Sequence, residues 1–245
     1  MSNLNNPAGR LYKLLVAFDA AASPSVVIND VWAEVLGVST ADLLPALGQA
    51  AALLGEVKTV VERTGKPSLA ASYATFSAGW ATPFLSHGRN PASEASHELI
   101  DKNSLVALGM VSEVLGMIAP EGVIPTEEQT TQLNDELNSV LDALEADTEL
   151  SAELRAAMAA RIHDILWAIS HVRIVGPDGV QAATEKLVGQ LLIFSVREPT
   201  SRRASVFQRA AGVALRAWAV FRAGSEAHEA LEGWEQMFKA LPSGD

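Results

Sequence analysis

Apolar residues recur at intervals of three and four along almost the whole chain, and this spacing constrains the fold more than any other feature. A clear instance is the row formed by Leu133, Leu137, Val140, Leu141 and Leu144. Residues spaced in this way lie on one face of an α-helix, because the helix turns once every 3.6 residues. Strand-like alternation is confined to residues 191–196, whose flanks have a helical pattern. The spacing predicts an all-α fold, a multi-helix bundle of about ten helices.

Several helix ends can be placed from capping residues. Asn6 and Pro7 are the residue types preferred at the cap and at the first position of a helix. Thr126 and Gln129 have the spacing of a capping box. Ser39 is expected to cap a helix that reaches about residue 65.

Further along the chain, the segment 151–175 is expected to be one helix that ends at Gly176 and Pro177. A last short helix is expected over residues 225–241. Pro120, Gly122 and Pro125 mark the clearest linker. We therefore expect an N-terminal helical subdomain at 1–119, a linker at 120–125 and a C-terminal helical bundle at 126–245, with one continuous domain as the alternative.

The charge of the chain is strongly segregated. Its net charge is −11, and the segment between Lys102 and Arg155 holds eleven Asp and Glu but no Lys or Arg. The segment 197–222 has the opposite character, with six Arg and one Glu. An acidic chain is a poor ligand for nucleic acid, so we expect no nucleic-acid partner.

The absence of cysteine excludes a thiolate nucleophile, a disulfide and a cysteine-ligated metal. The first residues lack the pattern of a signal peptide, and no long stretch is apolar and uncharged. We expect a cytoplasmic protein without a cofactor.

The segments NNPAGRLYKLL and VWAEVLGV, within residues 5–38, resemble the opening of an uncharacterised bacterial family of all-helical proteins. The resemblance implies a helical fold and brings no known activity or catalytic residue with it.

The adjacent His163 and Asp164 raise the question of a metal site. A His-Asp pair on a helix is the core of a family of metal-dependent phosphohydrolases, so such a hydrolase is one alternative function. His171 cannot share the ion, because eight helical residues separate its backbone from that of His163 by about 12 Å. His163, Trp167, His171 and Ile174 instead form a second face of their helix, opposite its main apolar row. We expect this face to pack internally or to bind a partner.

Arg202, Arg209 and Arg216 repeat every seven residues beside a broad apolar arc that includes Trp218 and Phe221. One hypothesis is an internal helix whose arginines cover apolar surface and pair with carboxylates. The others are a partner contact, a phosphate-binding stripe and an amphipathic helix on an anionic membrane.

A second series repeats every seven residues, at Glu128, Asp135, Asp142 and Glu149. These carboxylates lie opposite the apolar row of their own helix, so we expect them to face water. We do not expect them to pair with the arginines inside one molecule.

The polar segment 86–103 holds many side chains capable of catalysis, among them His87, Arg89, His97 and Asp101. It is either a ligand-binding or catalytic loop or a solvated connection between helices. No motif of a known catalytic class accompanies it, and no catalytic, cofactor-binding or metal-binding residue is assigned.

We therefore favour a non-enzymatic interaction protein, such as a regulator, an immunity-type factor or a complex subunit. Its partner would be another protein or a second copy. The alternatives are a metal-dependent hydrolase that uses His163 and Asp164 or the segment 87–102, and a membrane-associated protein that uses the helix 201–222.

Overall fold

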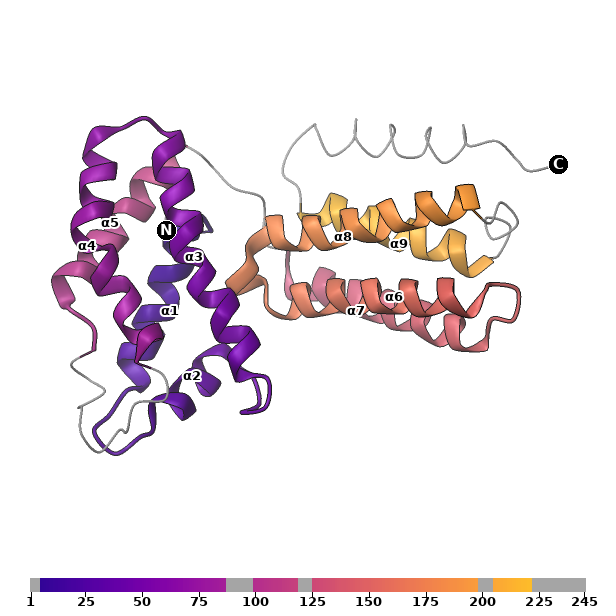
Figure 1. The fold of residues 1–245 in the computed structure, drawn as a ribbon, viewed down its shortest axis with the longest axis horizontal. Coiled ribbons are helices and arrows are strands. Elements are labelled where there is room, and N and C mark those ends of the chain that lie inside the picture. The colour runs from indigo at the N-terminus through magenta and orange to yellow at the C-terminus, as the bar shows by residue number, and fades with distance from the viewer. Residues whose placement is uncertain (1–4, 87–98, 119–124, 198–204, 222–245) are drawn as a thin grey trace. The chain divides into compact units, whose positions relative to one another are not determined.

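The computed structural model describes residues 5–86, 99–118, 125–197 and 205–221. Within these ranges it contains nine helices and no strand, so the predicted all-α fold is confirmed (Figure 1). The expected helix at 225–241 lies outside the described residues. In chain order the helices are α1 (Pro7–Ala21), α2 (Ile28–Leu36), α3 (Leu43–Arg63), α4 (Pro67–Leu85), α5 (Lys102–Ile118), α6 (Glu127–Ala146), α7 (Ala152–Ser170), α8 (Val172–Arg197) and α9 (Ser205–Phe221).

The chain divides into two compact units. Unit 1 comprises residues 1–121 and the short segment Arg173–Gly176, and unit 2 comprises residues 122–172 and 177–245. One crossing between the units falls in the expected linker at 120–125. The other two lie at the ends of Arg173–Gly176, a segment that the sequence placed in the C-terminal bundle.

Unit 1 is built around α1, which packs against α2, α3 and α5. Its start agrees with the sequence, because the side chain of Asn6 accepts a hydrogen bond from the backbone N–H of Gly9 at 3.0 Å. Trp32 of α2 lies between Phe18 of α1 and Phe84 of α4, with ring centroids 4.6 and 4.7 Å away. These rings join three helices in one hydrophobic core.

A buried arginine holds the segment Arg173–Gly176 in unit 1. Arg10 is only 3% exposed, and its guanidinium donates to the carbonyl oxygens of Asn5 at 2.5 Å and Ile174 at 3.2 Å, and to the carboxylate of Glu56 at 2.8 Å. Gly176 has a φ of 69°, and a Cβ atom there would lie 2.5 Å from the guanidinium carbon of Arg10. Glycine is therefore required at this position by both the backbone conformation and the available space.

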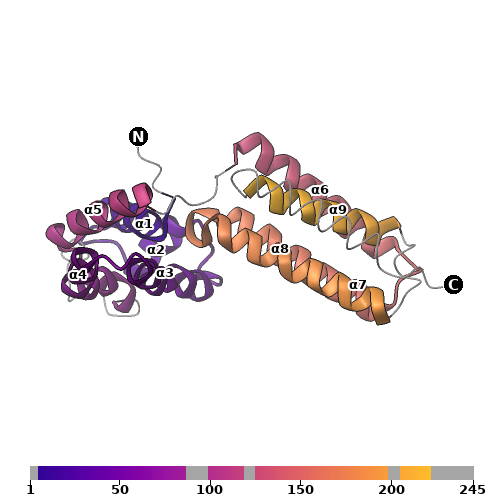
Figure 2. The ribbon, with the colours of Figure 1, turned by 90° about the horizontal axis from the view of Figure 1, so that it is seen from above.

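Unit 2 is a bundle of α6, α7, α8 and α9, which run side by side in Figures 1 and 2. α6 packs against both α7 and α9. Arg161 of α7 donates to the side chain of Gln190 of α8 at 3.1 Å, and Gln181 of α8 donates to the backbone oxygen of Phe221 of α9 at 3.2 Å. Each helix therefore contacts two others, as expected of a four-helix arrangement with antiparallel neighbours.

α6 has the start and the buried face that its sequence predicts. Thr126 and Gln129 form the capping box, with each side chain bonded to the backbone N–H of the other residue. Four residues of the predicted apolar row are buried and Leu141 is half-buried. The heptad carboxylates at 128, 135, 142 and 149 are exposed, as expected.

Two expected helix ends are wrong. The segment 151–175 is not one helix, since α7 ends at Ser170 and His171 leaves helical geometry with a φ of −110°. The hydroxyl of Ser39 donates to the carboxylate of Asp42 at 2.6 Å, and α3 begins only at Leu43. α3 therefore starts four residues after Ser39, and α7 ends five residues before Val175.

Candidate functional site

The polar segment 86–103 is only partly within the described residues. His87, Arg89 and His97 lie outside them, whereas Asp101 directly precedes α5. The carboxylate of Asp101 accepts hydrogen bonds from the N–H of Asn103 at 3.2 Å, and from the N–H and hydroxyl of Ser104 at 3.0 and 2.8 Å. These bonds, led by the one from the Ser104 hydroxyl, lower the pKa of Asp101 below its usual value. Asp101 therefore caps α5 and is committed to helix formation.

His163 and Asp164 are both exposed on α7. Asp164 accepts a hydrogen bond from Arg161 at 2.6 Å, one turn earlier on the same helix. His163 lines a shallow groove between α6 and α7 that also contains Arg155 and Asp142. Among the residues that the structure describes, no group of three or more His, Asp or Glu side chains could hold a metal ion.

Trp167 and His171 stack on each other at the end of α7. Their ring centroids are 4.4 Å apart with an interplanar angle of 14°, and Nδ1 of His171 lies 2.9 Å from the backbone oxygen of Trp167. The expected second face does not extend to Ile174, which is buried in the core of unit 1. The face fails there because the chain leaves α7 before it reaches this residue.

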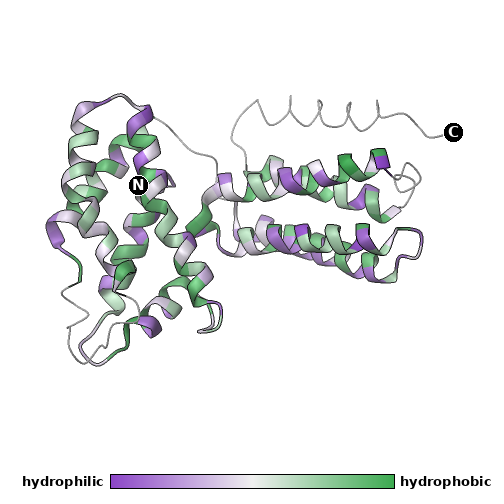
Figure 3. Cartoon of the chain, viewed as in Figure 1, coloured by the Kyte–Doolittle hydropathy of each residue, from purple (hydrophilic) through white to green (hydrophobic). Residues whose placement is uncertain are grey.

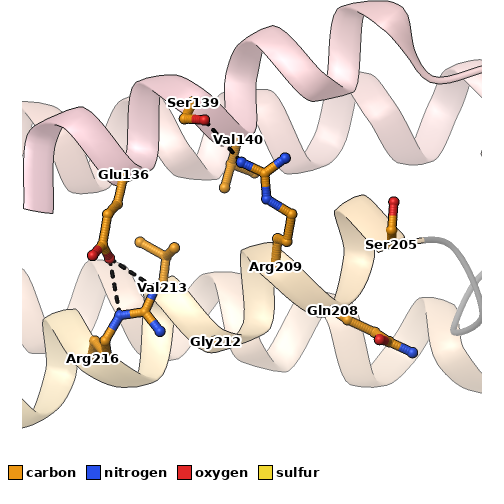
Figure 4. Close-up of a pocket in the computed structure, with 9 residues that line it drawn as sticks. All are labelled: Glu136, Ser139, Val140, Ser205, Gln208, Arg209, Gly212, Val213 and Arg216. Carbon is orange, nitrogen blue, oxygen red and sulfur yellow. Dashed lines mark hydrogen bonds and ion pairs between the residues drawn. The ribbon is translucent and has the colours of Figure 1, made fainter.

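The arginines of α9 line a groove against α6 of about 500 Å³ (Figure 4). Arg216 donates to the Glu136 carboxylate through Nε at 2.9 Å and lies within 2.8 Å of it through Nη2. Arg209 donates to the hydroxyl of Ser139 at 2.8 Å. Arg202, the third member of the series, lies outside the described residues.

This groove brings together Arg209 and Arg216, which were both candidates from the sequence. Their contacts with Ser139 and Glu136 hold α9 against α6. The apolar arc of α9 is mostly buried, including Trp218 and Phe221, and so faces the interior of unit 2. The side-chain contacts of the groove include the ion pair of Arg216 with Glu136 and the hydrogen bond from the Arg209 guanidinium to Ser139. The carboxylate that lines the groove, Glu136, is bound by Arg216 and opposes the binding of an anion.

A different surface, on unit 1, has the composition of a binding site. α4 contains no charged residue from Pro67 to Leu85, although only four of its residues are buried. None of its residues has the deep purple of a charged side chain in Figure 3. Its exposed residues are mostly small: Ala70, Ala71, Ala74, Thr75, Ala78 and Thr82.

α5 packs beside α4 and continues this surface. The indole N–H of Trp80 donates to the backbone oxygen of Ser104 at 2.7 Å, which fixes the contact between the two helices. The outward side of α5 carries Val106, Met110 and Met117, which are 63%, 64% and 78% exposed. We call these three residues and the six small residues of α4 the α4–α5 face.

The α4–α5 face was not among the sequence candidates. α5 is apolar on nearly all sides, so its periodicity does not indicate which side is buried. One signal was present in the sequence: no charged residue occurs between Lys66 and Arg89. A helix that exposes half of its surface to water ordinarily carries charges on that side.

The described part of the chain contains no helix long and apolar enough to cross a membrane. No family model, curated protein or solved structure matches this chain.

Proposed function

We propose that this chain is a non-enzymatic helical protein that acts by binding a protein partner on the α4–α5 face. One observation carries the proposal: a whole exposed helix side without charge, next to three exposed large apolar residues. Contiguous exposed apolar surface is a mark of interaction sites in proteins. Methionine is also enriched at such sites, because its flexible thioether adapts to a partner's shape.

Burial of this face would release considerable free energy. Complete burial of a valine or methionine side chain contributes about 1.5 to 3 kcal/mol. The exposed fractions of Val106, Met110 and Met117 leave more than half of that contribution available at each residue. Because Glu113 is the one charge on the outward side of α5 between Val106 and Met117, the matching surface of the partner is apolar and largely uncharged.

The roles of three polar candidates within the described residues support a non-enzymatic protein. Asp101 caps α5, Asp164 pairs with Arg161, and Arg216 pairs with Glu136. Each of these side chains is used to hold or start a helix.

The proposal is tested by site-specific photo-crosslinking in the cells that make the protein. A photoreactive amino acid at Met110 is expected to give a discrete adduct with one protein. Ile193 is the matched control, because it is an apolar residue of similar exposure, 56%, on α8. The adduct should be lost when Ala78 on the same face is changed to Glu. If neither Met110 nor Val106 gives an adduct above that of Ile193, the proposal is wrong.

A further inference from the structure

We infer that unit 1 binds a small oxyanion of the phosphate class between Lys13 of α1 and Arg173 of the segment Arg173–Gly176. This site contains no residue of the α4–α5 face, so the inference goes beyond the proposed function and does not depend on it. Three observations carry it: where the chain places these two cations, what they contact, and how their charges affect each other.

Arg10 is the residue that brings the two cations together. Lys13 follows Arg10 by three residues on α1, so the two side chains leave the same side of the helix. Arg173 comes directly before Ile174, whose carbonyl oxygen accepts a hydrogen bond from Nε of Arg10 at 3.2 Å. Gly176 passes so close to Arg10 that a Cβ atom there would lie 2.4 Å from Nη1. Lys13 and Arg173 are therefore both next to one buried guanidinium, although they are far apart in the sequence.

Neither cation has an acceptor among the residues that the structure describes. Lys13 and Arg173 are exposed, and they make no hydrogen bond or ion pair within the described ranges. Glu56 of α3 supplies a carboxylate to the cluster, but that carboxylate is bound to Nη2 of Arg10 at 2.8 Å. The contacts of the cluster thus set three positive charges against one carboxylate. The donors of Lys13 and Arg173 remain available to a ligand.

The positive charges of the cluster act on one another. Partial burial of the ammonium group lowers the pKa of Lys13 below its ordinary value, and the charges of Arg173 and Arg10 lower it further. A like charge has this effect on a neighbouring group at short range, because it disfavours the charged form. An anion bound between Lys13 and Arg173 would offset this repulsion, so its binding should raise the pKa of Lys13 again.

A phosphate group fits the chemistry of this cluster. It carries about −1.5 to −2 charges at neutral pH and offers at least three strong acceptor oxygens. These oxygens can accept charge-assisted hydrogen bonds from an ammonium and from a guanidinium at the same time. Two such bonds at an exposed site correspond to a dissociation constant on the order of 1 mM.

The site is composite, and its ligand should therefore stabilise unit 1. Arg173 lies beside Lys13 only when its segment is docked in unit 1, so the complete site exists only in that state. A ligand that binds one state of a protein shifts the equilibrium toward that state. At ten times the dissociation constant, amides that exchange by opening of unit 1 should become about elevenfold more protected.

The test is native-state hydrogen exchange of the full chain in sodium phosphate, compared with sodium chloride of equal ionic strength. The α1 amides of the wild type should show the elevenfold rise in phosphate, and the α6 amides of unit 2 should not. Lys13→Gln and Arg173→Gln should each lose most of this rise. Each change removes a repulsion, so neither should reduce protection in chloride. Lys58→Gln is the matched control, because it removes an exposed lysine of unit 1 that pairs with Glu62 at 3.9 Å.

An NMR titration of the Lys13 ammonium adds a readout that a merely structural role would not move. Phosphate should raise the pKa of Lys13 in the wild type, and it should raise it less in Arg173→Gln. Equal protection in phosphate and in chloride, or an equal rise in α1 and α6, would overturn the site. A rise that persists in both Lys13→Gln and Arg173→Gln would overturn it as well. Loss of the rise in Lys58→Gln would show general screening of charge and would also count against the site.

Discussion

Units 1 and 2 have the same helical class and similar cores, but their water-exposed sides differ. Helix α6 of unit 2 exposes Glu127, Glu128, Asp135, Asp142 and Glu145 opposite its buried leucines. Helix α4 of unit 1 exposes mainly alanine and threonine, with Leu85 at its end, and no charge. α6 therefore has the surface of a helix that faces water, whereas the exposed side of α4 has the composition of a helix that packs against protein.

The units also differ in how the chain completes them. Unit 1 takes up Arg173–Gly176, which lies at the start of α8, before the kink at Gly176, and is held by Arg10. Its core therefore includes Ile174, a residue more than 50 positions after its last helix. Changes at this segment and at the helix ends of each unit should therefore affect one unit and spare the other.

The largest effect is expected from Gly176→Ala. The added Cβ would meet the guanidinium of Arg10, and the positive φ would be strained, so the free energy of unfolding of unit 1 should fall by about 2 to 4 kcal/mol. Native-state hydrogen exchange of α1 and α3 amides, compared with α6 amides, measures this difference.

The matched control is Gly55→Ala in α3, where a Cβ would meet nothing within 4 Å. This change should stabilise unit 1 by up to about 1 kcal/mol, since alanine restricts the unfolded chain. If Gly176→Ala lowered the protection of both units equally, the segment would not belong to unit 1 alone.

A smaller effect, on unit 2, is expected from Thr126→Ala. Loss of the Thr126 hydroxyl should lower the free energy of unfolding by about 1 kcal/mol, because the backbone N–H of Gln129 at the start of α6 loses its acceptor. Urea unfolding monitored by α6 amides measures it. Thr131→Ala, at an exposed position inside the same helix, should cause no loss. An equal loss from both changes would contradict the capping role.

A still smaller effect is expected from Arg216→Met at the α6–α9 groove. Its ion pair with Glu136 is partly exposed, so the change should cost less than about 1 kcal/mol and should cost less still in high salt. Thermal unfolding at low and high salt checks this. Arg209→Met removes only a bond to a hydroxyl and should show a weaker salt dependence. An effect of several kcal/mol would mean that the groove is more than a helix contact.

The smallest effect is expected from Asp101→Asn, which should change how the stability of unit 1 depends on pH in acid. Hydrogen bonds lower the pKa of Asp101 in the folded protein, so its contribution to stability is present above the ordinary aspartate pKa. That contribution is lost as the pH falls below about 4 and through the lowered pKa. Asp101→Asn should reduce the loss of α5 protection in acid, as measured by hydrogen exchange, whereas Glu113→Gln in the exposed part of α5 should not. An identical acid response in wild type and Asp101→Asn would contradict this role.

The sequence alone determined the helical class, the starts of α1 and α6, and the buried row of α6. These features depend on residues within one or two turns of each other, so their spacing is sufficient to predict them. The segregation of charge is also evident in the sequence, and it predicted that the carboxylates of α6 are exposed.

Only the tertiary structure decided which of the candidate residues come together and which of them are exposed. The partner of Arg216 is 80 positions away on α6, and Ile174 left its expected helix face for the core of unit 1. On α5, apolar residues surround the helix, and contacts with α1 and α4 decided that Leu108 is buried and Met110 exposed. Periodicity describes one helix at a time, whereas the exposed face of a helix is set by its neighbours.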